Sequence, residues 1–473
     1  MPHEIEADWD QFHMLPACVE DWIGSDHAAR FIREFVDELD LGDLGFLLVS
    51  GGTQGRPRYA TKLLLRVWLY GYFEKVRSSR QLEKACTERM GFVWLCGGHR
   101  PDHNSLWRFW KENRAALKKL FKQSVQVAMQ LKMVGFLSQA IDGTKIQSCS
   151  GTRSSCDQAS LQRQLERLDK SIEELEQALE QTAGGGEADA SLPRELRQQS
   201  ALRERVREAL TQVQAGTARH IHPNEPDARR MGVDGRNRFA YNAQAAVDSK
   251  EQVIVAAEVT NAPNDKGQLK PMIEQASQTT GQNCAQTLAD GGYSSAEQIA
   301  QTQAHNVVMP LPSSVENKDE RPYHASNFTY ESKSDEVICP QGRRIPFQRE
   351  RLRGGARVRV YRSAQTCKGC PVRTLCTKDR HGRTIDICAN HEALQAHRSK
   401  MATPESQQAY QLRARIVEPV FGWIKELDGL RRWSYRGLEN VTVQWKMLCT
   451  AQNLRSIFQK WLQSRSPRPL ATS

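Results

Sequence analysis

The sequence predicts a mixed α/β protein made of several structural units. From about residue 25 to 135, apolar side chains recur every three or four positions between short polar breaks, which is typical of packed helices. Strand and helix patterns then interleave from about residue 137 to 312, which favours an α/β core. A chain of 473 residues is also too long for one ordinary core, so we expect two to four units.

The charge of the chain favours a polyanionic partner. Lys and Arg number 66 against 55 Asp and Glu, a formal net charge of +11, and DNA, RNA or an anionic membrane would all match it. No apolar run is long enough to span a bilayer, and the first residues, "MPHEIEADWDQFHM", lack the layout of a signal peptide. We therefore expect a soluble cytoplasmic protein whose twelve cysteines are reduced or bind metal.

Residues 1–133 are predicted to form an all-helical DNA-binding domain. Positive side chains gather there beside Trp107 and Trp110, as a surface that grips phosphates requires. The alternative is a helical bundle with a solvated basic face. The basic residues are Arg77, Arg80, Lys84, Arg100, Arg108, Lys111, Arg114, Lys118 and Lys119, of which Arg77, Arg80, Arg108 and Lys111 are our candidates for DNA contact.

The predicted core begins at residues 134–312. In "FLSQAIDGTKIQS", Ile141 and Ile146 indicate a strand with Asp142 near its middle. Leucines at alternating steps of three and four then predict an antiparallel helical hairpin inserted at 158–215. Its seam serves either plain packing, which we favour, or contact between two chains.

More strands follow the inserted hairpin. The segment "NRFAYNAQAAVDSKEQVIVAAEVTNAPND" reads as two strands joined by a turn. "AQTLADGGYSSAEQIAQTQ" then reads as a strand, a glycine loop and a helix, and "NVVMPLP" as one more strand. Asp290 falls at the end of its strand, where functional groups are common.

A third acid, Glu418, lies in the segment "RIVEPVFGWIKEL", whose apolar spacing predicts an amphipathic helix. Pro419 follows it, although proline disfavours a helix. Each acid also has an ordinary explanation: Asp142 can belong to a turn, Asp290 can cap a helix, and Glu418 can be solvated. Asp248 and Asp265 compete for the same role from turn-like contexts.

Three carboxylates brought together from two strands and a helix would suit hard divalent cations. Two Mg²⁺ or Mn²⁺ ions about 4 Å apart align an attacking hydroxyl and a leaving 3′-oxygen at a phosphate. Lys425 follows Glu418 by seven residues, so the two side chains share a helix face about 10 Å apart. We expect Lys425 to grip an adjoining phosphate, and Pro419 to bend or start the helix so that Glu418 meets the two aspartates.

Residues 313–392 are predicted to form a zinc-binding insertion. Four cysteines there have the spacing of a structural, non-catalytic Zn²⁺ site: Cys339, Cys367, Cys370 and Cys376. Cys388 and His391 are alternatives for the fourth ligand, and unlinked reduced thiols are the plainer reading. The insertion also carries arginines that either touch DNA or are solvated: Arg343, Arg344, Arg349, Arg351, Arg353, Arg357, Arg359 and Arg362.

Taken in order, several of these segments resemble the DDE transposases of bacterial insertion sequences, and most closely the group named IS eleven-eighty-two. The resemblance covers about residues 25 to 460. It implies an N-terminal DNA-binding domain, a ribonuclease H-like catalytic domain, and an Asp142, Asp290 and Glu418 triad that binds two divalent ions. The matching segments are "RSSRQLEKAC", "RPDHNSLWRF", "IDGTKI", "EPDARRM", "YNAQAAVD", "TNAPNDKGQL", "ADGGYSS", "IVEPVFGWIK", "RGLENV" and "AQNLRSI".

Related insertion-sequence families carry a Tyr-x2-Arg-x3-Glu-x6-Lys signature around the last acid. Tyr410, Arg413, Glu418 and Lys425 follow it, except that four residues separate Arg413 from Glu418, and Arg415 is an alternative to Arg413. The resemblance thus adds Tyr410, Arg413 and Lys425 to the candidate DNA contacts. It also implies that the protein acts on the element's terminal repeats and target DNA, as a homodimer or larger assembly.

The resulting functional prediction is a bacterial, nucleoid-associated transposase that excises and integrates an insertion sequence. The alternatives are an endonuclease of the same fold that cuts without joining, and a DNA-binding repressor without catalysis. Residues 393–462 complete the core with the helix of the third acid, and 463–473 are predicted to be a disordered tail.

Overall fold

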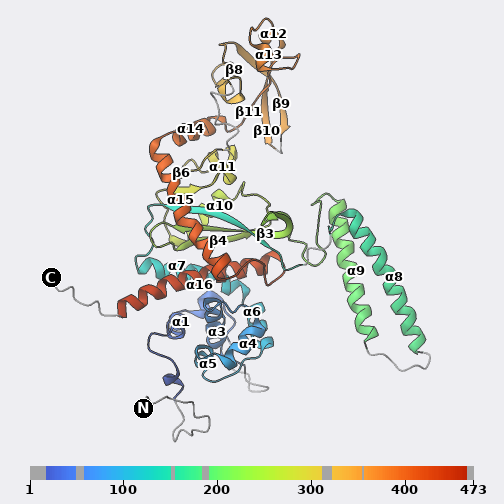
Figure 1. The fold of residues 1–473 in the computed structure, drawn as a ribbon, viewed down its shortest axis with the longest axis vertical. Coiled ribbons are helices and arrows are strands. Elements are labelled where there is room, and N and C mark those ends of the chain that lie inside the picture. Colours follow the sequence, from blue (N-terminus) through green and yellow to red (C-terminus); the bar gives the residue numbers. More distant parts are fainter. Residues whose placement is uncertain are drawn as a thin grey trace, which may run out of the picture.

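The computed structural model describes residues 18–48, 58–150, 155–183, 191–311, 322–353 and 356–465. Figure 1 shows helices at the N-terminal end, a sheet in the middle, a β-rich lobe at the far end and a helical hairpin that projects sideways. Most of the predicted tail, residues 466–473, lies outside the described residues.

The N-terminal unit is helical. Side chains of Ser78 and Asp102 accept backbone N–H groups at the starts of α4 and α6, as helix N-caps do. Trp68, Tyr72 and Trp110 are buried together in its core. The elements are η1 (Val19–Trp22), α1 (Ala28–Asp37), α2 (Leu41–Leu44), α3 (Thr61–Phe73), α4 (Ser79–Glu88), α5 (Met90–Leu95), α6 (His103–Glu112) and α7 (Arg114–Gln130).

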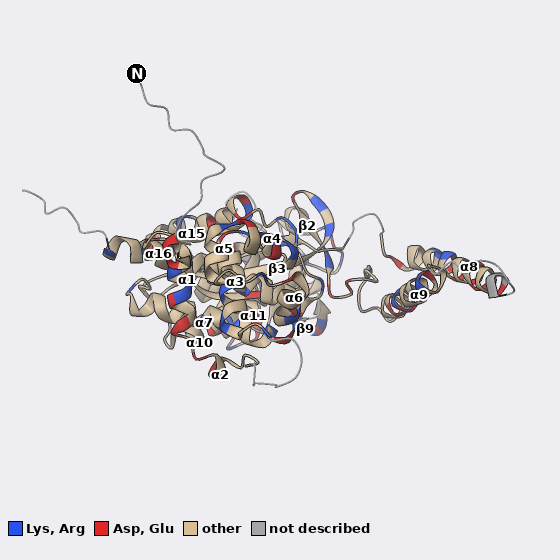
Figure 2. Ribbon diagram, turned by 90° about the horizontal axis from the view of Figure 1, so that it is seen from below, with Lys and Arg blue, Asp and Glu red and all other residues tan. Residues whose placement is uncertain are grey.

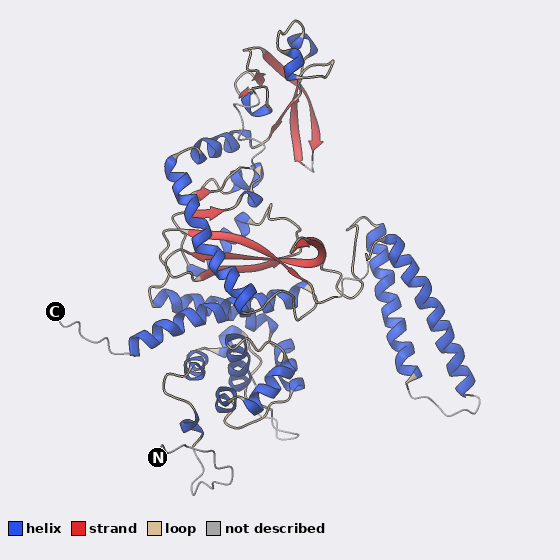
Figure 3. Ribbon diagram, in the orientation of Figure 1, coloured by secondary structure: helices blue, strands red, loops and turns tan. Residues whose placement is uncertain are grey.

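A mixed sheet forms the middle of the molecule, with helices packed against it (Figure 3). Its strands are β1 (Gln139–Gln147), β2 (Arg229–Val233), β3 (Arg236–Asp248), β4 (Ile254–Thr260), β5 (Thr287–Ala289) and β6 (Val307–Val308), in the order β2-β3-β1-β5-β6, with β4 also paired to β3. β1 is antiparallel to β3 and parallel to β5, and β5 is parallel to β6. This α/β arrangement is consistent with a ribonuclease H-like core.

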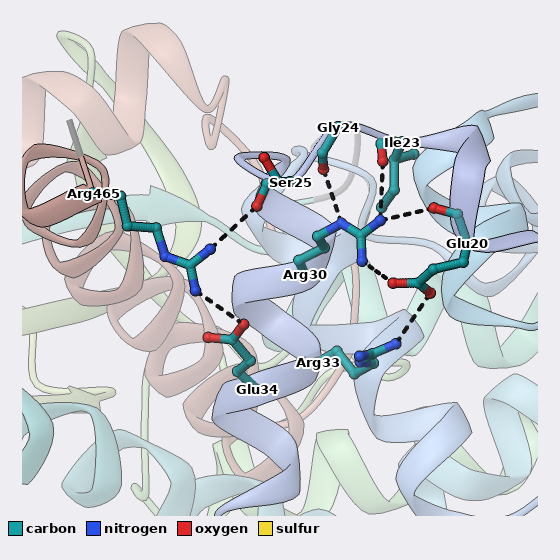
Figure 4. A network of polar contacts seen from close by, with 8 residues as sticks. All are labelled: Glu20, Ile23, Gly24, Ser25, Arg30, Arg33, Glu34 and Arg465. Atoms are coloured by element: carbon teal, nitrogen blue, oxygen red, sulfur yellow. Dashed lines mark hydrogen bonds and ion pairs between the residues drawn. The ribbon is translucent and has the colours of Figure 1, made fainter. Parts of the chain in front are cut away.

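Helices join the core to the N-terminal unit. The long helix α16 (Leu438–Arg465) packs against α7, α3 and β4. Asn453 of α16 accepts the N–H of Ile254 and donates to its carbonyl, each at 2.9 Å, and so completes the ladder of β4. At the end of α16, Arg465 contacts Glu34 and the Ser25 carbonyl near α1 (Figure 4). Helix α16 thus continues three residues into the predicted tail.

The inserted hairpin consists of α8 (Gln158–Ala183) and α9 (Leu192–Gln214), which lie side by side. Leu161, Leu168 and Ile172 of α8 are buried, as are Val206 and Leu210 of α9. Figure 2 shows both signs of charge along the projecting pair. In this single chain the apolar seam packs within the hairpin.

The β-rich lobe has a sheet and a small apolar core of its own. Its sheet has the order β11-β10-β9-β8-β7, and Phe328, Val337, Ile345, Tyr361, Ile385 and Ile387 are buried together. The strands are β7 (Thr329–Glu331), β8 (Glu336–Ile338), β9 (Arg344–Arg353), β10 (Ala356–Tyr361) and β11 (Ile385–Cys388), with η4 (Ala325–Asn327), α12 (Ala364–Cys367) and α13 (Arg373–Cys376). A metal is therefore not the lobe's only source of packing.

The chain returns from this lobe to the sheet through two helices. They are α14 (His391–Met401) and α15 (Pro404–Gly422), and α15 runs into the π-helical turn η5 (Trp423–Leu427). Helix α15 packs against β1 and β5. The remaining core elements are α10 (Leu269–Thr280), η2 (Gly291–Tyr293) and α11 (Ala296–Gln301).

Candidate active site

Asp142 and Asp290 lie next to each other on neighbouring strands. β1 and β5 run parallel, with Ile141 opposite Ala289; Asp142 is the next residue of β1, and Asp290 directly follows β5. Asp290 also accepts the N–H of Gly292 at 2.8 Å, which caps the short turn η2 and fixes its carboxylate. The parallel register between β1 and β5, two segments far apart in the sequence, brings these two acids together.

A single cation stands between the two carboxylates. Arg413 of α15 places its Nη2 atom 2.7 Å from Asp142 and 3.9 Å from Asp290, and only 11% of its side chain is exposed. The Nε atom of Arg413 is buried and has no hydrogen-bond partner among the described residues. The two carboxylates thus bind a positive charge, while the Nε–H group of Arg413 has no acceptor in the described part of the chain.

Burial dominates the electrostatics of Asp142. Loss of solvent raises the pKa of its carboxyl to about 6, while Arg413 and the Gly143 N–H oppose the rise, and Asp290 and Asp265 add to it. The carboxylate form is therefore costly without more positive charge than Arg413 supplies.

Asp265 is the third acid near the pair. Its Oδ1 atom accepts the side-chain amides of Asn242 and Gln244, each at 2.7 Å. Gln244 is held in turn by the hydroxyl of Tyr293, which donates to its Oε1 atom. Asn242 and Gln244 project from the same face of β3 and are fully buried. Their side-chain amides therefore have fixed positions beside Asp265.

The other competing acid, Asp248, has a structural role. Its side chain accepts the N–H groups of Gly135 and Phe136 at 2.9 and 3.0 Å, and that of Lys250 at 2.9 Å. It is 2% exposed and closes the β3–β4 turn. Asp248 is therefore not part of the site.

Glu418 does not face the two aspartates in this structure. It is exposed on α15, whereas its neighbour Val417 is buried. Five residues along an α-helix turn the side-chain direction by about 140° and advance about 7.5 Å, which separates Glu418 from the position of Arg413. The third acid of the signature is thus on another part of the helix surface.

Pro419 lies inside α15 and does not start it, because the helix begins at Pro404. A proline within a helix leaves the carbonyl four residues earlier without its usual partner. That carbonyl belongs to Arg415, and it accepts the side-chain amide of Gln252 at 2.9 Å. The helix continues past the proline because a distant turn satisfies the freed carbonyl.

Comparison with known families decides the class of protein. Residues 338–458 match the model described as transposase DDE domain, and residues 17–112 match the one described as transposase domain DUF772. The chain belongs to the DDE transposases of insertion-sequence type. Such transposases are metal-dependent polynucleotidyl transferases that act on DNA. Neither match reaches Asp142 or Asp290, and a search of curated proteins found no match.

Four cysteines of the transposase line one small cavity in the β-rich lobe. Cys339, Cys367, Cys370 and Cys376 surround about 30 Å³, which is room for one ion or water. Burial raises the pKa of the Cys376 thiol, Arg383 opposes this, and the other three thiols add to it. Cys388 and His391 do not line the cavity.

Arg343 fixes the loop that carries the paired cysteines. Its guanidinium donates to the carbonyls of Thr366, Lys368 and Gly369 at 2.9 to 3.1 Å. Arg343 is thus engaged inside the lobe, although the sequence made it a candidate for DNA contact.

Several other arginines of the lobe are already paired. Arg344, Arg351, Arg359 and Arg362 form ion pairs with Glu331 and Glu336, Asp386, Asp335 and Asp379 respectively. Arg349 and Arg357 are exposed and form no ion pair within the described residues, and the side chain of Arg353 lies outside them. Fewer arginines of this lobe are therefore free to contact a DNA phosphate than its arginine content indicates.

The candidate DNA contacts of the transposase differ in exposure. Arg80, Arg108 and Lys111 are exposed on α4 and α6, whereas Tyr410 and Lys425 are half-buried. Arg77 is half-buried too; burial lowers its pKa, and Asp428 opposes that shift. Trp110 belongs to the core, and Trp107, 39% exposed, stacks on Tyr435.

As the side chains stand, no three His, Cys, Asp or Glu residues within the described ranges are arranged to hold a metal ion. An ion at either candidate site therefore requires side chains to turn. A helix both long and apolar enough to cross a membrane is likewise absent from the described ranges.

Proposed function

We propose that this transposase excises and integrates an insertion sequence by two-metal-ion phosphodiester hydrolysis, followed by strand transfer from a 3′-hydroxyl. Asp142, Asp290 and Glu418 are the proposed catalytic acids. The observation that supports the proposal most is the adjacency of Asp142 and Asp290 on parallel strands, with Arg413 between them.

The residues at the paired aspartates fit a divalent cation. A guanidinium already occupies the space between two carboxylates, and oxygen donors are what Mg²⁺ and Mn²⁺ prefer. Asp142 and Asp290 would hold the ion, which when bound supplies charge stabilisation at the reacting phosphate. The proposal of a second ion rests on the family resemblance.

Arg413 is the residue that we assign to the reacting phosphate. Its buried Nε atom has no acceptor within the described residues, and a phosphate oxygen is an acceptor that an arginine fork matches well. Lys425 and Tyr410 are further candidates along the same helix and its π-helical turn. Exposed Arg80, Arg108 and Lys111 are proposed to bind the phosphates of the terminal repeats.

We also propose that Cys339, Cys367, Cys370 and Cys376 hold one structural Zn²⁺. The support is a cavity of about 30 Å³ that all four thiols line, and four soft ligands complete a closed tetrahedral site. Since the lobe has its own apolar core, the metal would stiffen the loops of Cys339 and Cys367 to Cys376 and would not create the fold.

The proposed function is tested with a labelled DNA that carries the element's own terminal repeats. Wild type should cleave it and join the 3′ end to target DNA in Mg²⁺ but not in EDTA. Asp142→Asn and Asp290→Asn should abolish both steps, whereas Glu405→Gln, an exposed acid on the same helix as Arg413, should retain them. Cleavage without joining would identify an endonuclease, and DNA binding without any metal-dependent cleavage would identify a repressor.

A further inference from the structure

One carboxylate oxygen of Asp265 accepts hydrogen bonds from two buried amides, and the other oxygen is available to a ligand. Both amide hydrogen bonds, from Asn242 and Gln244, go to its Oδ1 atom. Asn242 and Gln244 are at most 1% exposed, so their amides have no water as an alternative partner. Within the described residues, Oδ2 receives no hydrogen bond. Because Asp265 is held through Oδ1 alone, its Oδ2 atom is oriented to bind a ligand.

Two glycines let Asp265 approach the segments that carry the other aspartates. A side-chain carbon added at Gly143, next to Asp142, would lie 2.9 Å from Asp265 Oδ1 and 2.2 Å from the amide of Gln244. A carbon added at Gly292, two residues after Asp290, would lie 3.6 Å from Asp265 Oδ2. The carboxylate of Asp265 therefore sits between the two backbone segments.

The charges at this place do not balance. Asp142, Asp265 and Asp290 are three carboxylates, and Arg413 is the one cation within 4 Å of Asp142 and Asp290 among the described residues. With all three acids ionised, the group lacks two positive charges. A divalent ion supplies that amount, and Asp142, whose side chain is 20% exposed, has the most to gain from it.

We propose that Asp265 is a further metal-binding acid of this transposase, which shares a divalent ion with Asp142 and Asp290. It provides the carboxylate near the pair that Glu418 does not provide in this structure. Asn242 and Gln244 are positioning residues, since they orient Asp265 without touching the ion. The inference rests on the proposed function, because it assumes that Asp142 and Asp290 hold the metal.

Manganese binding to the full-length protein without DNA tests the inference apart from activity. Titration calorimetry with Mn²⁺ should show that Asp265→Asn and Asp290→Asn each weaken binding about tenfold or more. Glu405→Gln, an exposed acid of α15 outside the proposed site, should remain within about twofold of wild type, and thermal unfolding should show that every variant is folded. Wild-type affinity in a folded Asp265→Asn protein would overturn the inference.

A second measurement uses the wild-type chain and so does not depend on any variant folding. Fe²⁺ bound in place of Mg²⁺ generates radicals with ascorbate and peroxide, which cut the backbone beside the ion. Cuts are expected near residues 142, 265 and 290, and cuts near 142, 290 and 418 without one near 265 would refute the role of Asp265. If neither Asp142→Asn nor Asp290→Asn weakens Mn²⁺ binding, the proposed metal site itself fails.

Discussion

The Nη2 atom of Arg413 lies 2.7 Å from the Oδ2 atom of Asp142, so a helix from the last part of the core supplies the cation that faces the first strand. A guanidinium in this place competes with a metal ion for the same carboxylates. It also limits the cost of burying the Asp142 carboxylate when no ion is bound.

Replacing Arg413 by Gln should therefore have opposite effects on metal binding and on catalysis. Mn²⁺ should bind more tightly, because a competing positive charge is removed. Cleavage should fall about a hundredfold, because a donor to the reacting phosphate is lost. Calorimetry and single-turnover cleavage measure the two effects. A parallel loss of Mn²⁺ affinity would show that Arg413 organises the acids and does not compete with the ion.

Removal of one cavity cysteine should release zinc. Protein purified without chelators should contain about one Zn²⁺ per chain. Cys370→Ser should lose most of it, because four thiolates are needed for a closed tetrahedral site. Cys388→Ser is the matched control, since Cys388 lies in β11 outside the cavity. Equal zinc in both variants, measured by atomic absorption, would remove these four cysteines as the ligand set.

Arg455 joins the N-terminal unit to the core and should matter for stability. Its guanidinium pairs with Asp428, which is 4% exposed, and donates to the carbonyls of Tyr72 and Phe73 at the end of α3. Arg455→Met leaves a buried carboxylate without its partner and should cost about 3 kcal/mol in denaturant unfolding. Arg465→Met removes a half-exposed pair at the end of the same helix and should cost less than about 1 kcal/mol. Equal losses would contradict the role of Arg455.

The stability of the α14 region should depend on pH through His397. Burial lowers the pKa of this imidazole below 6.5, although its hydrogen bond to the Met309 carbonyl opposes the shift. The folded state then binds fewer protons than the unfolded state. Stability is therefore present above about pH 6.5 and falls as the pH drops through the folded-state pKa.

His397→Gln tests this dependence, because glutamine keeps a donor for Met309 but does not titrate. The melting temperature of the variant should fall less than that of wild type between pH 7 and 5. His391, whose pKa burial also lowers, remains as a background in both proteins. Identical slopes would exclude His397 as a source of the pH dependence.

Local patterns predicted the strands of Asp142 and Asp290, and the parallel register of β1 and β5 places the two acids side by side. The position of Glu418 could not be predicted in the same way, because one residue along a helix changes the side-chain direction by about 100°. Val417, its neighbour, is the buried residue. The signature predicts the helix but not which face meets the sheet.

Asp265 and Pro419 depend on partners that are distant in sequence. Asp265 looked like an ordinary turn acid, and its role becomes visible only with Asn242 and Gln244 of β3 beside it. The alternating polar residues in "YNAQAAVD" were the available signal, because buried amides inside a strand require partners. Pro419 predicted a helix bend or start; the start is wrong, because α15 begins at Pro404 and continues past Pro419, where Gln252 donates to the Arg415 carbonyl.

The most direct test of the metal site exchanges a proposed oxygen ligand for sulfur. Asp142→Cys should be inactive on terminal-repeat DNA in Mg²⁺, which binds thiolate poorly, and should regain measurable cleavage in Mn²⁺, which accepts it better. Glu405→Cys on α15 is the control and should cleave equally in both metals. Rescue confined to Asp142→Cys would establish that Asp142 contacts the catalytic ion. Full activity of Asp142→Cys in Mg²⁺ would contradict the proposed site.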